Sequence, residues 1–242
     1  MKNGISRFWD RFLNVLYPPK CPGCGELLEI SPEPLPLCPV CRAKWENEKN
    51  GQCQRCRRSI RECRCHPVYN KSRTCDSYRS AAYYTDKSVA KGIVLAMKYG
   101  ASEELYKLAA REIELLIFRS INLREDDLVI VYPPRGKKSV KKYGFDHTKK
   151  IAGYVNEHYG IPVCPAVLHK GGTEQKKLNY GQRGENAVNS FEITENARQL
   201  RGKRVILIDD VVTTGATTVA VAALCKAAGA VSVHCFTLAA TP

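Results

Sequence analysis

The sequence lacks any run of 18 consecutive apolar residues, and it shows no secretory signal peptide. These two absences argue against a membrane-spanning helix and predict a cytoplasmic protein, with membrane association only through partners. Acidic residues are also scarce: 24 Asp and Glu stand against 38 Lys and Arg, for a formal net charge of +14. An excess of this kind favours polyanionic partners, either nucleic acid or pyrophosphate.

The length and composition allow a substantial core. The chain has 242 residues, 44% of them hydrophobic, which fits one large domain or two small ones. The positive charge is uneven: it lies in residues 1–80 and in residues 135–150, where seven basic residues accompany one acid. We expect these two regions to meet the anionic partner.

Cysteine, in contrast, is abundant, and eight of the twelve cysteines lie within residues 20–66. Without a secretion signal, this number favours metal-bound thiolates over disulfides. Two C-x-x-C pairs lie 13 residues apart, a third follows, and a C-x-C motif precedes a histidine. Two turns with paired thiolates complete a closed tetrahedral zinc site, so the metal is expected to be structural. The predicted ligands are Cys21, Cys24, Cys38, Cys41, Cys53, Cys56, Cys63 and Cys65.

The spacing leaves three points open in this cysteine-rich region. Cys63 could act with Cys65 or with His66 at C-x-x-H spacing. A cross-braced arrangement, with the first pair joined to the third, is an alternative to sequential pairing, and the number of zinc ions is one or two. The four isolated cysteines are predicted to be small core residues. They are Cys75, Cys164, Cys225 and Cys235.

The stretch 205–217, V-I-L-I-D-D-V-V-T-T-G-A-T, predicts a strand, a turn and a helix. Four apolar residues form a short buried strand that ends at Asp209 and Asp210. A turn of small residues follows, with Gly215 where the backbone must be permissive. An Ala-rich helix over 217–226 and a strand over 231–238 complete a βαβ unit. The ligand crevice of such a unit lies outside the carboxyl end of the strand.

The residues of this unit point to a phosphorylated sugar. Free N–H groups at the start of a helix form an anion site that suits a phosphate monoester. The two carboxylates are expected to bind vicinal hydroxyls or a divalent metal, and the sequence indicates no structural partner for them. The loop is not a nucleotide-binding P-loop, because no G-K-[ST] follows the glycine. The predicted ligand residues here are Asp209, Asp210, Thr213, Thr214, Gly215, Ala216 and Thr217.

A second candidate anion site follows the predicted strand 128–132. That strand runs into Pro133 and Pro134 and then into Arg135, Lys137 and Lys138, a set of cations suited to pyrophosphate. A crossover helix is expected over 144–158, with His147 as a hydrogen-bonded structural residue near the loop. The glycine-containing segment 170–190 is long enough to act as a lid over the ligand.

The predicted domain organisation has four parts. Residues 1–19 form an amphipathic helix, either packed on the protein or bound to a membrane surface or partner. The zinc module spans 20–66, a linker spans 67–77, and the larger domain spans 78–242 with a strand at 78–85 and helices at 88–98 and 103–119. Arginines on the module could grip nucleic-acid phosphates, and Trp45 either stacks on a base or packs against the module.

The stretch 205–217 resembles the binding motif for phosphoribosyl pyrophosphate (PRPP) of type I phosphoribosyltransferases. From about Tyr17 onward, the chain resembles the ComF family, specifically the ComFC-like competence proteins. That resemblance rests on the cysteine pairs, on Lys98-Tyr99-Gly100, on Gly144-Phe145 and on Thr173-x-Gln175-x-x-Leu178 with Arg183, Asn186 and Phe191. Family members usually read R-G-F-N-Q where this chain has residues 143–147, and P-x-P where it has Tyr132-Pro133-Pro134.

The resemblance implies a type I phosphoribosyltransferase-like α/β fold: a twisted, mostly parallel sheet with helices on both faces, preceded by a small zinc ribbon. It further implies a PRPP-binding protein that handles DNA during competence, with Mg²⁺ accompanying PRPP. Single-stranded DNA and competence-machinery proteins, such as a helicase at the membrane, are the implied partners. The alternative is an active phosphoribosyltransferase whose acceptor, like the oligomeric state, the sequence does not specify.

Overall fold

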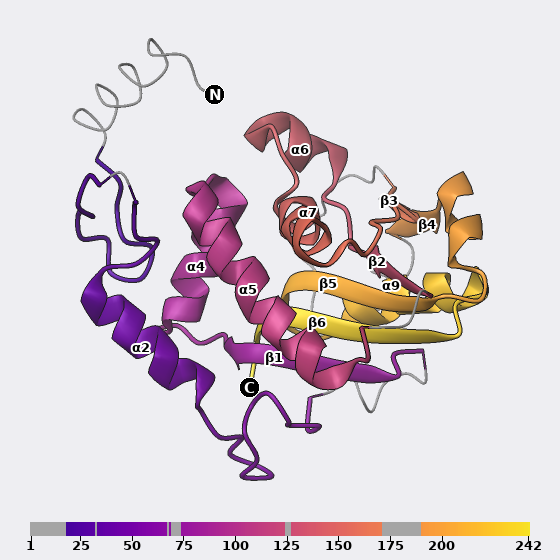
Figure 1. Cartoon of the computed structure of the whole chain (residues 1–242), viewed down its shortest axis with the longest axis horizontal. Helices are drawn as coiled ribbons and strands as arrows, with labels where there is room; N and C mark the ends of the chain where they lie inside the picture. The colour runs from indigo at the N-terminus through magenta and orange to yellow at the C-terminus, as the bar shows by residue number, and fades with distance from the viewer. Residues whose placement is uncertain (1–17, 32, 67, 69–73, 124–126, 171–189) are drawn as a thin grey trace.

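A computed structural model describes residues 18–31, 33–66, 68, 74–123, 127–170 and 190–242. Its main sheet has four parallel strands in the order β1-β6-β5-β2 (Figure 1). A small antiparallel pair, β3 with β4, lies beside it. The strands are β1 (Ser77–Tyr83), β2 (Leu128–Val131), β3 (Val167–His169), β4 (Phe191–Ile193), β5 (Arg204–Val212) and β6 (Ser232–Ala240). The predicted α/β fold with a parallel sheet is confirmed.

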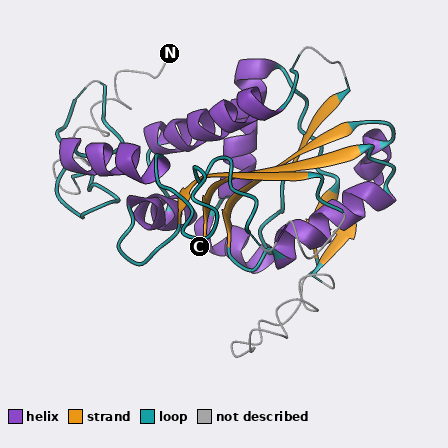
Figure 2. Cartoon of the chain, turned by 90° about the horizontal axis from the view of Figure 1, so that it is seen from below, coloured by secondary structure: helices purple, strands orange, loops and turns teal. Residues whose placement is uncertain are grey.

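Helices cover both faces of this sheet (Figure 2). On one face, α4 (Val89–Tyr99), α5 (Glu103–Ser120) and α7 (His147–Tyr159) pack on alternate residues of the strands, including Ile206 and Ile208. On the other face, α9 (Ala216–Ala227) and the 3-10 helix η1 (Glu195–Leu200) pack on the intervening residues, including Val205 and Leu207. Because both faces are buried, the central strands are continuously apolar, as expected for a parallel sheet.

Strand β5 is longer than the sequence predicts. We expected it to end at Ile208, but it continues through the two acids to Val212. The backbone of β6 lies in register along the whole extension, with Asp209 opposite Thr237 and Val212 opposite Ala240. A ladder provided by a neighbouring strand overrides the weak strand propensity of aspartate.

The segment between β2 and α7 also differs from the prediction. Residues 137–143 form the short helix α6 (Lys137–Tyr143), where we expected an irregular loop. Gly144 then adopts a left-handed conformation, with φ +79°, and ends α6 instead of beginning the crossover helix. Helix α7 begins later, at His147, because the Asp146 side chain caps it by accepting hydrogen bonds from Thr148 N and Lys149 N.

The cysteine-rich segment packs directly on the sheet domain. It contains helix α2 (Pro39–Lys49), whose Glu48 carboxylate accepts hydrogen bonds from Val89 N and Ala90 N at the start of α4. Cys21 and Cys41 share one apolar core with α4 and α5. The predicted helix at 1–19 and most of the predicted linker at 67–77 lie outside the described residues. Among the helices that are described, none is long and apolar enough to cross a membrane.

The isolated cysteines are core residues, as predicted. The structure buries all four of them: Cys75, Cys164, Cys225 and Cys235. Burial in apolar surroundings raises the pKa of the Cys75 thiol to about 11 and of the Cys225 thiol to about 12. A thiol with so high a pKa is protonated and unreactive near neutral pH.

Candidate functional site

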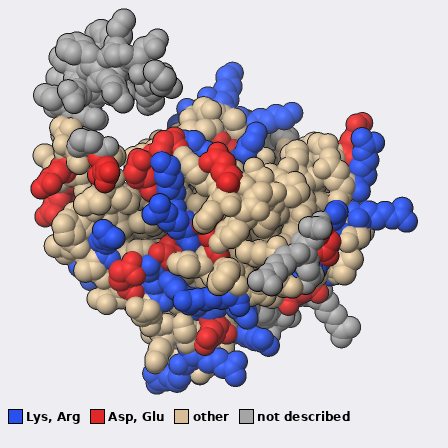
Figure 3. Space-filling model, viewed as in Figure 1, with Lys and Arg blue, Asp and Glu red and all other residues tan. Residues whose placement is uncertain are grey.

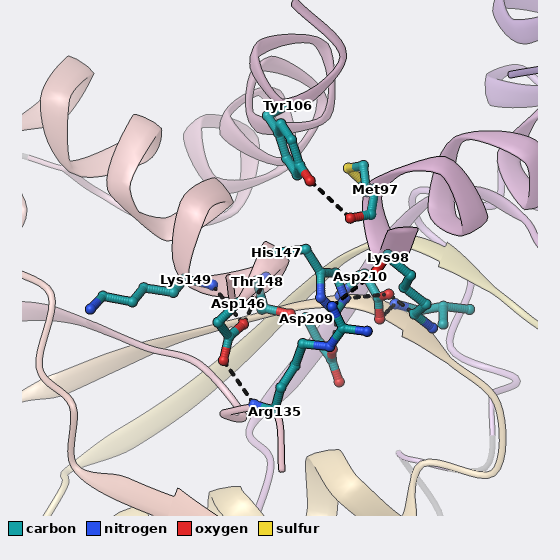
Figure 4. Close-up of polar contacts among 11 residues, drawn as sticks. Met97, Lys98, Tyr106, Arg135, Asp146, His147, Thr148, Lys149, Asp209 and Asp210 are labelled. Carbon is teal, nitrogen blue, oxygen red and sulfur yellow. Dashed lines mark hydrogen bonds and ion pairs between the residues drawn. The ribbon is translucent and has the colours of Figure 1, made fainter. Parts of the chain in front are cut away.

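Both acids of the predicted ribose site are buried near the carboxyl end of β5. Successive side chains of a strand point to opposite faces of the sheet. Asp210 therefore faces α4 and α7, where it meets side chains of both helices (Figure 4). Asp209 lies on the face of β5 that also carries Leu207. Its Oδ1 accepts a hydrogen bond from Asp210 N at 2.8 Å.

Asp210 pairs with two side chains, Lys98 and His147, that the sequence did not indicate as its partners. Its Oδ2 lies 3.0 Å from Lys98 Nζ and 2.8 Å from His147 Nε2. Burial by itself would raise the pKa of this carboxyl, but the His147 hydrogen bond and the Lys98 charge outweigh it and lower the pKa to about 2. The expectation that these acids lack structural partners is wrong for Asp210. The prediction that His147 is a hydrogen-bonded residue is confirmed.

The pKa of Asp209 is displaced in the opposite direction to that of Asp210. Burial and the neighbouring charge of Asp210 raise its pKa well above 3.8, the ordinary value for aspartate. Two adjacent carboxyls with pKa values displaced in opposite directions are typical of a site prepared for a ligand. A bound cation or a pair of sugar hydroxyls would offset the cost of ionising Asp209 at this position.

Because the two pKa values are displaced in opposite directions, replacing each aspartate by asparagine should change the free energy of unfolding of the unliganded protein in opposite directions. Asp210→Asn should lower the free energy of unfolding at pH 7 by roughly 2–3 kcal/mol, the effect that corresponds to a pKa lowered from 3.8 to about 2 by Lys98 and His147. Asp209→Asn should raise the free energy of unfolding at pH 7, because it removes a buried charge that the fold disfavours. Urea denaturation at pH 7 measures both effects.

The pH dependence of the two effects follows from the direction of each shift. The folded-state pKa of Asp210 is depressed, so its stabilisation is present above pH 3.8 and is lost as the pH falls towards 2. The folded-state pKa of Asp209 is raised, so its penalty is absent below pH 3.8 and grows as the pH rises towards that folded value. The gain from Asp209→Asn should therefore disappear at pH 3.5. A shift of both variants in the same direction at pH 7 would contradict this description.

The predicted phosphate turn is placed directly after this strand. Gly215 has φ +78° and is the N-cap of α9, where it has no side chain to cap the helix. Thr214 Oγ1 accepts a hydrogen bond from Ala216 N, and Thr213 is exposed. The first N–H of α9 is thus bonded to Thr214, and the N–H groups that follow it, together with the helix dipole, suit an anion.

Gly215 also has a structural role that the sequence did not indicate. A Cβ atom at this position would lie 2.5 Å from Cγ2 of Val68, a fully buried residue of the segment after the cysteine-rich module. The glycine is therefore required both by its left-handed backbone and by the close approach of Val68. Replacing Gly215 would test the fold together with the phosphate site.

The candidate pyrophosphate residues divide into two groups. Arg135 lies beside the acid pair, and its Nη1 donates to the Lys98 carbonyl at 3.0 Å (Figure 4). Its guanidinium lies 4.9 Å from the centre of the Tyr143 ring. Its backbone N–H donates to Asp146 Oδ2. Lys137 and Lys138 are exposed in the first turn of α6. Asp146 thus links the loop of Arg135 to the start of α7.

The eight predicted zinc ligands form two groups of four. Cys21, Cys24, Cys38 and Cys41 make the first cluster, and Cys53, Cys56, Cys63 and Cys65 make the second. Within each cluster all the sulfur atoms lie within 4.8 Å of one another, so each could hold one metal ion.

The sulfur geometry of both clusters fits zinc. Sulfurs at about 2.3 Å from a tetrahedral zinc ion lie about 3.8 Å apart. The distance from Cys24 Sγ to Cys38 Sγ is 3.7 Å, and from Cys56 Sγ to Cys63 Sγ it is 3.8 Å. The pairs are therefore grouped in sequence order and not cross-braced. His66 is not in the second cluster; its ring packs 5.1 Å from that of Tyr78.

The packing of α2 rules out one predicted contact with nucleic acid. Trp45 is 1% exposed, and its Nε1 donates to the buried Glu112 of α5. Lys49 and Arg61 also pair with Glu112. The idea that Trp45 stacks on a nucleic-acid base is therefore wrong, and the other reading, in which it packs within the protein, is confirmed. The sequence around Trp45 did not indicate this partner, because Glu112 lies on α5, 67 residues further along the chain.

Some residues that carry the ComF resemblance lie outside the described residues. The predicted lid at 170–190 lies almost wholly outside the described residues. So do Thr173, Gln175, Leu178, Arg183 and Asn186. Phe191, in contrast, is buried at the start of β4.

Comparison with known proteins matches the carboxy-terminal part of the chain to one protein family. Residues 170–242 match the sequence model of the family described as "Phosphoribosyl transferase domain". No curated protein matches the chain. Two solved structures are similar over 60% of this chain and 30% of their own, each at 18% identity. One is the allosteric regulatory enzyme of purine biosynthesis, with a TM-score of 0.39, and the other is glutamine PRPP amidotransferase from B. subtilis, with a TM-score of 0.37.

The chain thus spans about a third of the length of these two proteins, and their activities are not transferred to it by the comparison. The family match includes the acid pair, the turn and α9. Residues 170–242 of this α/β protein are therefore similar to the phosphoribosyl transferase domain family.

Proposed function

We propose that this protein binds PRPP, or a related phosphoribosyl compound, at the carboxyl end of β5. The observation that carries the proposal is the buried acid pair placed directly before the N-terminus of α9, whose N-cap is a glycine. The helix N-terminus receives the 5-phosphate, and Asp209 and Asp210 receive the ribose hydroxyls. Arg135, with Lys137 and Lys138 further along α6, binds the pyrophosphate. Mg²⁺ would accompany PRPP, and the same carboxylates would hold it and help to neutralise the pyrophosphate.

Calorimetric titration with PRPP and with ribose 5-phosphate tests this proposal. Binding of PRPP should be tighter in the presence of Mg²⁺, because the ion neutralises the pyrophosphate beside two carboxylates. Ribose 5-phosphate should bind more weakly and with little dependence on Mg²⁺. Failure of both compounds to bind would overturn the proposal.

Zinc in the two cysteine clusters has a structural role in this proposal. Four thiolates close each tetrahedron and leave no position for a substrate or a reactive water. The clusters shape the exposed loops around them, which carry much of the positive charge of the chain. Arg55, Arg57, Arg58 and Arg64 are all exposed in the second cluster.

We further propose a ComFC-like role in which these loops hold DNA during competence. Basic side chains gather over the loops of the second cluster, at the lower edge of the molecule in Figure 3. Such a surface binds the phosphate backbone without reading sequence. Single-stranded DNA is the ligand that fits uptake, and a helicase at the membrane is the partner that would supply it. Because Trp45 is buried, the binding is expected to be electrostatic without a stacking contribution from that residue.

Affinity for a short single-stranded DNA should fall steeply with salt. Replacing Arg55, Arg58 and Arg64 together by alanine should make the slope of log K against log [salt] shallower by about 2, at about 0.7 per phosphate contact. Fluorescence anisotropy at several salt concentrations measures this slope. A matched control removes three exposed cations elsewhere, Lys87, Arg119 and Arg198. An equal change in the control, or affinity that does not depend on salt, would contradict the proposal.

The second candidate function is an active phosphoribosyltransferase. It is favoured by the position of Asp209, a buried carboxyl next to Asp210 near the end of β5, whose ionised form would stabilise a developing positive charge on the ribose ring. In this reaction C1 of the ribose loses pyrophosphate and bonds to an acceptor. Release of pyrophosphate from PRPP in the presence of candidate acceptors tests this function separately from binding.

A further inference from the structure

Lys98, in the last turn of α4, contacts both parts of the proposed ligand site (Figure 4). Its Nζ lies 3.0 Å from Asp210 Oδ2, and its backbone carbonyl accepts a hydrogen bond from Arg135 Nη1 at 3.0 Å. Asp210 belongs to the proposed ribose site and Arg135 to the proposed pyrophosphate site. Lys98 therefore joins the two, although its sequence pattern indicates only the end of a helix.

Both carboxylate oxygens of Asp210 are already in contact with other groups. Oδ1 accepts a hydrogen bond from Val211 N at 2.7 Å, and Oδ2 lies 2.8 Å from His147 Nε2 as well as against Lys98 Nζ. Carboxylate oxygens suit Mg²⁺, so two adjacent aspartates fit the ion that PRPP would bring. In the free protein, however, the ammonium group of Lys98 lies against one of these oxygens and repels a second cation there.

Lys98 is the partner of Asp210 that a ligand can replace. The side chain of Lys98 is 31% exposed, whereas that of His147 is only 6% exposed. His147 is also fixed at the start of α7, and Val211 contributes a backbone N–H of β5. The ammonium group of a lysine, in contrast, is carried on a flexible four-carbon stem. Displacement of Lys98 from Asp210 therefore requires only a change of side-chain conformation.

The backbone at the end of α4 is anchored while this side chain is free to turn. Arg135 holds the carbonyl of Lys98, and Tyr106 Oη donates to the carbonyl of the preceding residue, Met97, at 2.8 Å (Figure 4). An ammonium group that leaves Asp210 thus stays close to Arg135. It would meet the pyrophosphate that Arg135 is proposed to bind, and an ammonium–phosphate contact is a strong charge-assisted hydrogen bond.

From these contacts we infer that Lys98 is an exchangeable counter-ion of the acid pair and a further pyrophosphate-binding residue. In the free protein it holds Asp210 and competes with a divalent cation for the carboxylates. When PRPP binds, its ammonium group passes from Asp210 to the pyrophosphate and leaves the carboxylates to the ribose hydroxyls and the metal. This inference rests on the proposed phosphoribosyl site.

Binding of Mn²⁺ alone to the zinc-loaded full chain tests the first half of the inference. Mn²⁺ prefers oxygen ligands, as Mg²⁺ does, and its free concentration is measured by electron paramagnetic resonance. Lys98→Met removes the competing charge and keeps a long side chain, so it should tighten Mn²⁺ binding at least about tenfold. Lys98→Gln, which keeps a polar side chain, should act in the same direction and guards against misfolding of the apolar variant.

Lys91 offers a matched control on the same helix. Its side chain is 32% exposed, and its Nζ pairs with Asp86 Oδ1 at 2.7 Å, away from the acid pair. Lys91→Met should leave the affinity for Mn²⁺ within about twofold of the wild type.

Calorimetric titration with PRPP and with ribose 5-phosphate tests the second half. Lys98→Met should weaken PRPP at least about tenfold, because one cation for the pyrophosphate is lost. Ribose 5-phosphate has no pyrophosphate, so its affinity should stay within about threefold. Tighter binding of the metal together with weaker binding of PRPP is a pair of effects that a general loss of structure does not produce.

The outcomes separate this inference from the proposed function. The role of Lys98 is wrong if Lys98→Met and Lys98→Gln leave either affinity unchanged, or if Lys91→Met reproduces their effects. In those cases, PRPP and ribose 5-phosphate that still bind the wild type leave the phosphoribosyl site in place. A wild type that binds neither compound overturns the phosphoribosyl site, and with it the pyrophosphate role of Lys98.

Discussion

Replacing Asp209 and Asp210 together by asparagine is expected to weaken binding of PRPP by at least about 100-fold. Each carboxylate makes charge-assisted hydrogen bonds to the ribose hydroxyls worth roughly 1.5–3 kcal/mol. Every 1.4 kcal/mol corresponds to a factor of about ten in affinity. Calorimetric titration of the double variant and of the wild type with PRPP measures the loss. Unchanged affinity would mean that the end of β5 is not a phosphoribosyl site.

The structure decides which single variant makes the cleaner test. Asp210 is buried against Lys98 and His147, so its replacement changes the stability of the fold as well as the ligand contacts. Asp209→Asn removes a ligand contact while it should stabilise the unliganded protein, so a loss of affinity in this variant cannot be attributed to unfolding. Asp86→Asn removes one exposed carboxylate outside the site and serves as the control. Gly215→Val is unsuitable, because its side chain would meet Val68.

Loss of the first zinc ion is expected to destabilise the whole protein. Cys21→Ser should release about one zinc per chain and lower the free energy of unfolding severely, since structural zinc contributes ~10 kcal/mol or more. Cys21, Cys38 and Cys41 lie in the same apolar core as α4 and α5. The sequence by itself predicts that residues 20–45 unfold in this variant. The shared core predicts that unfolding extends to the sheet domain.

Metal analysis with thermal unfolding measures this effect. Wild-type protein purified under reducing conditions should contain about two zinc ions, and Cys21→Ser about one. Cys53→Ser should release the other ion, because it belongs to the second cluster. Cys164→Ala is a matched control: this cysteine is buried and isolated from both clusters, so the zinc content should not change. Absence of zinc from the wild type would contradict the assignment of both clusters.

The central elements of the domain could be predicted from sequence because their signals are local. An apolar run of four residues, two acids and a small-residue turn specify a strand, a crevice and a helix within 13 positions of the chain. The C-x-x-C spacing likewise brings thiolates together within one turn. The burial of Cys225 and Cys235 follows from the apolar pattern of the helix and the strand that contain them.

Residues far apart in the chain decided the rest, and only the tertiary structure brings them together. Lys98 from α4 and His147 from α7 meet Asp210, and this meeting separates the pKa values of two identical adjacent side chains. Trp45 is buried and donates a hydrogen bond to Glu112 of α5. A cavity of about 370 Å³ is formed where the loops of the second cluster lie against the carboxyl ends of β1 and β6. Local pattern determines what an element is, whereas burial, electrostatic pairing and enclosed space depend on which distant elements pack against it.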